Sequence, residues 1–122
     1  MGCRTGELNI LTRRIPWDTI CGVEIRKTDE YDAWFIHLRD RQAKARINVQ
    51  LRKIELSGQL VGDFKVFGYL IELRFHFGPG YRVYATKKGD ALMLLLVGGD
   101  KSTQDADIAK AQRMAEEWRN EE

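Results

Sequence analysis

Five polar side chains stand two residues apart in two short stretches of the chain. The first stretch holds Glu72, Arg74 and His76, and the second holds Arg82 and Tyr84. Since alternate residues of a β-strand share one face, each stretch would present its polar groups together. Arginine can give two parallel hydrogen bonds to phosphate oxygens, a free histidine titrates near about pH 6.5, and tyrosine can stack on a base. The pattern predicts a surface suited to RNA.

Cleavage of RNA without a metal needs a base for the 2′-hydroxyl, an acid for the leaving 5′-oxygen and cations around the phosphate. Lys65 and Lys101 stand near the ends of neighbouring predicted elements and would add positive charge. The candidate catalytic residues are therefore Arg74, Lys65, Lys101, Tyr84 and His76, with Arg82 binding the RNA. Two plainer interpretations stay open: Glu72 and Arg74 form only a surface ion pair, and His76 is structural.

The sequence gives no support to a metal or cofactor site. It contains no motif typical of nucleotide triphosphate, dinucleotide or zinc-protease sites, and Cys3 and Cys21 have neither a CxxC spacing nor a clustered histidine. The turn at 98–102 could bind an anion through free backbone N–H groups, but Asp100 within it argues against a simple phosphate cradle. We expect no cofactor and no metal ligand.

Hydrophobic periodicity predicts the elements that position these groups. Alternating polarity indicates strands at 23–27, 64–67, 70–77 and 81–86, and an inner strand at 91–97 is apolar on both faces. Helices are expected after Thr28, from Asp40 to Glu55, and after Ser102 or Thr103, either of which could cap the last one. The order is typical of an α+β domain with a mainly antiparallel sheet, two N-terminal helices packed on one face and a C-terminal helix. The polar face of the sheet is expected to be free.

The second predicted helix is strongly basic. Between Arg39 and Lys53, six basic residues stand against the single acidic residue Asp40. Such a stretch could follow a phosphate backbone or an acidic partner, and the candidate RNA-binding residues on it are Arg41, Lys44 and Arg52. The alternative is a solvated helix face.

Length and composition describe one globular domain. The chain has 122 residues, of which 43% are hydrophobic and 31% charged. Its longest apolar run is too short for a membrane span and its start lacks the apolar core of a signal peptide, so we expect a cytoplasmic protein without membrane contact. Residues 1–22 show no clear period and are expected to be an N-terminal extension, partly disordered, before a domain at 23–122.

Several motifs, in order along the chain, resemble those of the RelE/ParE toxin superfamily, in particular its phage-derived, HigB-like addiction-module branch. They are Val23–Thr28 with Trp34-Phe35, Ala43–Ile47, Gly62–Lys65, Glu72–Arg74, Gly78–Tyr84 and Gly98–Gln104. The similarity spans roughly residues 23–118. It implies a RelE-like, microbial-RNase-like fold and a type II toxin whose partner is a cognate antitoxin, often a helix-turn-helix DNA-binding protein.

The resemblance also implies an activity. Members of the RelE arm cleave mRNA, commonly on the ribosome and without a metal, with basic residues and sometimes tyrosine in place of a strong general base. Carried over by motif, Arg74 matches the family's strand arginine and Lys101 its basic residue after the last strand, while Lys65, Arg82 and Tyr84 follow from neighbouring motifs. Two alternatives remain: a ParE-like inhibitor of DNA gyrase that cuts no RNA, and an inactive member that only binds its antitoxin.

Overall fold

A computed structural model describes residues 22–89 and 91–121, and the predicted N-terminal extension at 1–22 therefore lies outside the described residues except for Gly22. The described elements are β1 (Glu24–Lys27), α3 (Asp29–His37), α4 (Arg41–Ser57), β2 (Asp63–Phe67), β3 (Leu70–Phe75), β4 (Tyr81–Lys88), β5 (Leu92–Gly99), the short 3₁₀ helix η1 (Lys101–Thr103) and α5 (Gln104–Asn120). The chain is an α+β protein, as the sequence predicts. None of the described helices combines the length and the apolar character needed to cross a membrane.

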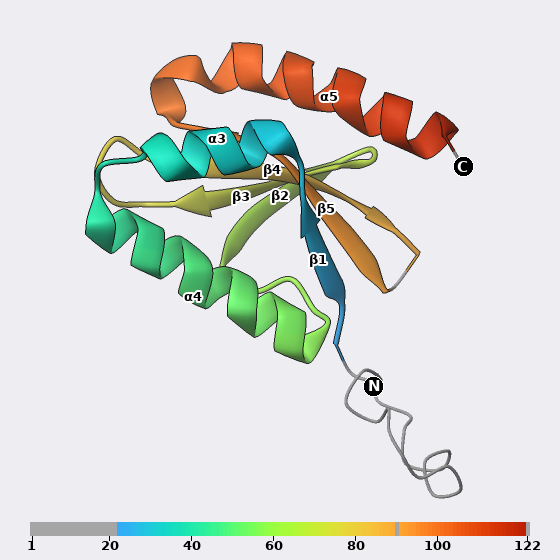
Figure 1. The fold of residues 1–122 in the computed structure, drawn as a ribbon, viewed down its shortest axis with the longest axis horizontal. Coiled ribbons are helices and arrows are strands. Elements are labelled where there is room, and N and C mark those ends of the chain that lie inside the picture. Colours follow the sequence, from blue (N-terminus) through green and yellow to red (C-terminus); the bar gives the residue numbers. More distant parts are fainter. Residues whose placement is uncertain (1–21, 90, 122) are drawn as a thin grey trace, which may run out of the picture.

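The strands form one mixed sheet in the order β1-β5-β4-β3-β2 (Figure 1). β1 pairs with β5 in parallel, whereas the other three pairings are antiparallel. The prediction of a mainly antiparallel sheet is therefore confirmed. β2 lies at one edge and joins β3 through a tight turn at Gly68, whose φ of 61° is the left-handed conformation that glycine adopts without strain.

Both N-terminal helices pack on one face of the sheet, as expected. Thr28 caps α3 by accepting a hydrogen bond from the Tyr31 amide, and Asp40 caps α4 through the Ala43 amide. The core between this layer and the sheet is formed by Tyr31, Ala43, Ile47, Leu51, Ile54, Ile71, Leu73, Phe75, Tyr81, Val83, Ala85, Met93 and Leu95, with Trp34, Phe35 and Phe77 at its margin. Leu73 and Phe75, which alternate with the polar residues of the strand predicted at 70–77, face these helices, so that alternation is confirmed.

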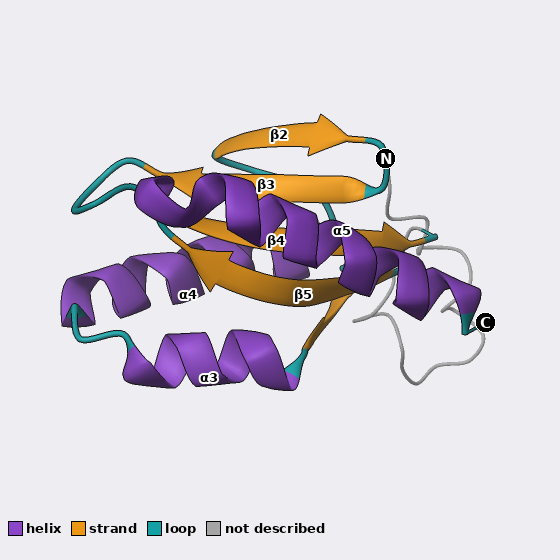
Figure 2. Ribbon diagram, turned by 90° about the horizontal axis from the view of Figure 1, so that it is seen from above, coloured by secondary structure: helices purple, strands orange, loops and turns teal. Residues whose placement is uncertain are grey.

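The opposite face is not free, which corrects the prediction. α5 crosses it and contacts β3, β4 and β5, so the sheet lies between two helical layers (Figures 1 and 2). Ala111 and Ala115 of α5 pack on a second core that includes Leu94, Leu96 and Tyr84. The physical reason is that both faces of β5 are apolar, so the face turned away from α3 and α4 must also be buried from water.

Two consecutive glycines of β5 allow helices to approach from both sides. A Cβ atom on Gly98 would lie 2.2 Å from the Trp34 ring, and one on Gly99 would lie 1.9 Å from the Asp107 carboxylate. In the structure β5 includes both glycines and ends at Gly99, whereas the sequence predicts that this strand ends at residue 97. Thr103, one of the two expected caps, is the N-cap residue of α5, but its side chain makes no capping hydrogen bond. The Asp100 side chain caps the preceding 3₁₀ helix η1 by accepting from the Ser102 amide.

Candidate functional site

Polar residues meet in one lateral row at the end of the sheet. The register pairs Asp63 of β2 with Arg74 of β3, Arg74 with Arg82 of β4, and Arg82 with Gly99 of β5. Because cross-strand partners share a face, the side chains of Asp63, Arg74 and Arg82 all lie on the α5 side. The β3–β4 turn and η1 close this end, and a Cβ on Gly80 would lie 3.4 Å from the Lys101 Cβ.

Glu72 is the centre of the cluster. Its side chain is fully buried, and its carboxylate accepts hydrogen bonds from Arg74 Nε at 3.0 Å, Tyr84 Oη at 3.1 Å and Gln104 Nε2 at 2.8 Å. Burial by itself would raise the pKa of Glu72, but the hydrogen bonds from Arg74, Gln104 and Tyr84 outweigh it and hold the pKa below its ordinary value. Glu72 is thus a fixed anion and a weak base.

The ion pair of Glu72 with Arg74 forms as the sequence suggests, but it is not a surface pair. The Arg74 side chain is 29% exposed while that of Glu72 is 0% exposed. The arginine therefore reaches from the buried carboxylate to the rim of the sheet. One of its donors is held by Glu72, and its orientation is fixed by a group that water does not reach.

Arg82 is almost completely buried and only partly paired. Its Nε lies 3.8 Å from Glu72 Oε2, which is an ion-pair distance but too long for a hydrogen bond. The Nε and Nη1 atoms are buried without a hydrogen-bond partner. Such unsatisfied donors on a charged group cost free energy, and an anionic acceptor would relieve that cost.

Tyr84 departs most from its predicted role. It is fully buried beneath α5 and its hydroxyl donates to Glu72, so it does not face solvent where a base could stack on it. Burial, followed by the neighbouring charge of Glu72, raises the pKa of Tyr84 far above its usual value. The expected exposed position is wrong because α5 covers β4. In this structure Tyr84 positions Glu72.

His76 lies just beyond β3 and is exposed. Its Nε2 forms a hydrogen bond with the Asp63 carboxylate, and this bond is the main reason that the pKa of Asp63 lies below its usual value, with the charges of Arg74 and Arg82 adding to the effect. The pairing of His76 with an acid at the end of the sheet keeps the imidazole near the two arginines.

Of the two lysines predicted as catalytic, one lies close to the arginines and the other does not. Lys101 is exposed on η1 beside the β3–β4 turn, at the same end as the arginines. Lys65 is the cross-strand partner of Glu72 on β2, but its ammonium lies 5.6 Å from the centre of the Phe67 ring, toward the other end of the strand. Lys101 therefore lies at the same end of the sheet as the cluster, whereas Lys65 stands at the margin of the cluster.

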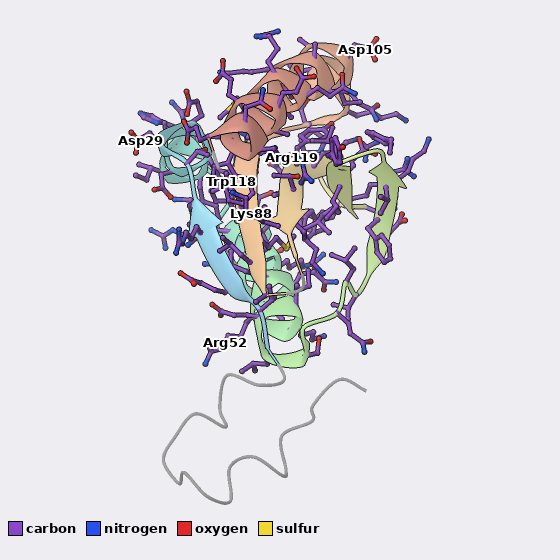
Figure 3. The ribbon with its side chains drawn as sticks, turned by 90° about the vertical axis from the view of Figure 1, so that its right-hand side faces the viewer. Asp29, Arg52, Lys88, Asp105, Trp118 and Arg119 are labelled. Atoms are coloured by element: carbon purple, nitrogen blue, oxygen red, sulfur yellow. The ribbon has the colours of Figure 1, made fainter. Side chains whose placement is uncertain are left out.

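The candidate RNA-binding residues of α4 also lie at different distances from the cluster. Burial and then the neighbouring Asp40 carboxylate raise the pKa of Tyr81. A Cβ on Gly78 would lie 3.7 Å from the same carboxylate, which places the start of α4, at Arg41, beside the β3–β4 turn. Lys44 donates to the Ile36 carbonyl and lies over the Phe35 ring. Arg52 pairs with Glu55 near the far end of the helix, and Figure 3 shows its side chain pointing away from the sheet.

Three residues of the cluster were not predicted as site residues: Glu72, which the sequence suggests only as an ion-pair partner of Arg74, and Asp63 and Gln104. From the sequence, Asp63 was interpreted as part of a turn. A two-residue turn at Gly68-Tyr69 sets a strand register that pairs Asp63 with Arg74, so this register is the signal that could have identified Asp63 as a site residue. Gln104 carries no signal of its own, because its contact with Glu72 depends on where α5 lies. Among the described residues, no group of three or more His, Cys, Asp or Glu side chains could hold a metal ion.

The fold and this cluster define a small α+β protein with a buried carboxylate that holds two arginines at one end of a mixed sheet. A protein of Haemophilus influenzae, described only as uncharacterized, is 41% identical to the chain over 96 residues, which cover 78% of this chain and 95% of that protein. The chain belongs to the same family as this protein. No protein-family model matches the chain.

Proposed function

We propose that the chain is a type II toxin of the RelE/ParE superfamily, HigB-like in its sequence motifs, and that it is a metal-independent, ribosome-dependent endoribonuclease that cleaves mRNA. The cluster of Arg74 and Arg82 around Glu72 is the observation that carries this proposal. Two guanidinium groups share one buried carboxylate, and Arg82 keeps unsatisfied donors. A phosphodiester would supply acceptors to the exposed part of Arg74, and it would reach the Nε and Nη1 atoms of Arg82 only after the groups that cover them move.

The chemistry assigned to each residue follows from its exposure. Arg74, with Lys101 nearby, stabilises the negative charge that develops on the phosphate oxygens, and Arg82 orients the phosphate from below. His76 is an exposed imidazole that is hydrogen-bonded to Asp63, and it is the residue assigned to proton transfer. Glu72 and Tyr84 position the arginines and do not contact the RNA. Lys65 requires a different rotamer to reach the phosphate.

The experiment is to induce the chain without any antitoxin and to map the 5′ ends of cellular mRNA. We expect growth arrest and new cuts in translated regions for the wild type, and their loss in Arg74→Ala. Arg26→Ala is a matched control, since Arg26 on β1 also pairs through Nε with a glutamate two residues earlier, at 2.9 Å, but at the far edge of the sheet. It should keep full activity.

The other outcomes decide against the proposal in distinct ways. Growth arrest with intact mRNA and a supercoiling defect would assign the chain to the gyrase-inhibiting arm. No arrest, with a stable complex formed by the neighbouring reading frame, would make it a member that only binds its antitoxin. Equal cleavage by Arg74→Ala and the wild type would remove Arg74 from the site.

A further inference from the structure

The edge strand β2 is the most exposed part of the described sheet. It pairs only with β3 among the described strands, and four of its five residues are exposed. In an antiparallel ladder, the N–H and C=O groups of alternate residues point away from the partner strand. The outer edge of β2 therefore offers backbone donors and acceptors in the spacing that another strand requires. Figure 2 shows this strand beside β3 at the sheet's margin.

Beside β2 the helical layer is incomplete. A groove of about 430 Å³ separates α4 from β3, and its apolar lining includes Val49, Val61, Leu73, Phe75 and Phe77. On the same face, Phe64 and Val66 of β2 are 39% and 54% exposed. Apolar surface thus runs from the groove to the free edge, and the described residues leave it uncovered.

The charges around this surface are mostly positive. Arg46 lines the groove and stacks on Phe77 at 4.6 Å, and Arg74 and His76 lie at its end, while Asp63 is the one acidic residue in the lining. On the other face of β2, Lys65 projects from the middle of the strand. Pairing with a second copy over the whole strand would centre on Lys65 and set two ammonium groups opposite each other, which is unfavourable. An acidic segment is favoured instead.

We propose that β2 and the adjoining groove bind an extended segment of a partner protein, in which apolar residues alternate with acidic ones, as an added strand of the sheet. Its apolar side chains would continue the surface of Phe64 and Val66, and its acidic ones would lie beside Lys65. The bound segment would end next to Arg74 and His76, so it would restrict access to the proposed RNA site. Binding itself does not require that the chain cut RNA.

The test uses a short fluorescent peptide in which valine alternates with glutamate, added to the full chain. Amide hydrogen exchange should show new protection at the outward-facing amides of β2. Val66→Asp should weaken peptide binding by about tenfold or more, because it places a carboxylate where the valines of the peptide would pack. Ile36→Asp is the matched control, since Ile36 is 67% exposed on α3, outside the groove, and it should bind normally. A peptide with lysine in place of glutamate should bind more weakly.

Three results would overturn the inference. They are no protection of β2 at peptide concentrations on the order of 1 mM, equal binding by Val66→Asp and the wild type, and protection of β2 without peptide that rises with protein concentration. The last result would assign the edge to a second copy of the chain. None of these measurements depends on RNA cleavage, so a failed nuclease proposal and a failed docking surface are distinguishable.

Discussion

Glu72 joins two strands and a helix through one carboxylate. It holds Arg74 on its own strand, Tyr84 on β4 and Gln104 on α5. A buried charge is tolerated only where it is paired and hydrogen-bonded, and here the carboxylate meets that condition while Arg82 meets it only in part. At the scale of the residue, stability and the proposed activity therefore depend on the same group.

Removing this carboxylate should be costly. Glu72→Ala leaves Arg82 buried without a counter-charge, so we expect the free energy of unfolding to fall by about 3–5 kcal/mol in urea titrations. Glu24→Ala breaks a pair of the same spacing whose side chains are 58% and 61% exposed, and should cost less than about 1 kcal/mol. Similar losses for the two variants would contradict the central role of Glu72.

The Glu72 carboxylate should also determine how the free energy of unfolding changes at acid pH. Because folding lowers the pKa of Glu72, its contribution is complete above the unfolded value near 4.5 and is lost as pH falls through the lower folded value. We expect the wild type to lose stability steeply below about pH 4.5 and Glu72→Gln to show a shallower slope there. Chemical denaturation at a series of pH values measures this, and identical slopes would refute it.

At the scale of the element, the two glycines at the end of β5 set how closely helices can approach the sheet. Gly98→Ala forces its methyl group into the rigid Trp34 ring, so we expect a loss of about 1–3 kcal/mol in urea unfolding. Gly99→Ala meets the end of the flexible Asp107 side chain, which can turn away, and should cost less. If Gly99→Ala proved the more harmful, the packing of α3 on β5 would be looser than the structure indicates.

The start of α5 depends on Asp100 more than on the hydroxyl residues that follow. Its Oδ1 accepts from both the amide and the hydroxyl of Ser102. Asp100→Ala should lower the free energy of unfolding by about 1 kcal/mol, the usual cost of losing an N-cap. Ser102→Ala removes an exposed hydroxyl and its hydrogen bond to Asp100 but keeps the amide bond, and should change the free energy of unfolding by less than about 0.5 kcal/mol in the same assay. The reverse order would make the Ser102 side chain the cap, which is one of the two caps that the sequence suggests.

At the scale of the whole molecule, local patterns predicted the elements well and the layers only in part. Period-two alternation identified β3, whose Leu73 and Phe75 face the first helices, and Thr28 correctly marked the start of α3. The position of α5 could not follow from periodicity, because an amphipathic helix does not specify which apolar surface it covers. That one placement decides whether Tyr84 is exposed and whether Gln104 reaches Glu72.

The arrangement also divides the basic residues of α4 into near and far groups. Arg41 begins the helix beside the β3–β4 turn, whereas Arg52 is eleven residues further along, or about 16 Å at the rise of an α-helix. RNA bound at Arg74 and Arg82 would pass close to Arg41 and would not reach Arg52. Lys88 at the end of β4 contacts the Trp118 ring, and Arg119 in the last turn of α5 contacts the Tyr69 ring, so both lie away from this end (Figure 3).

The distribution of charge over the molecule can be tested by salt dependence. If Arg41 contacts one phosphate, Arg41→Ala should weaken binding to a single-stranded RNA and reduce the slope of log affinity against log salt by about 0.7. Arg52→Ala removes the same charge from the same helix and should leave affinity and slope unchanged, since Arg52 already pairs with Glu55. Fluorescence titrations at several salt concentrations measure both. Equal effects of the two substitutions would mean that the RNA follows the whole helix, as its composition alone suggests, and would move the binding surface away from the end of the sheet.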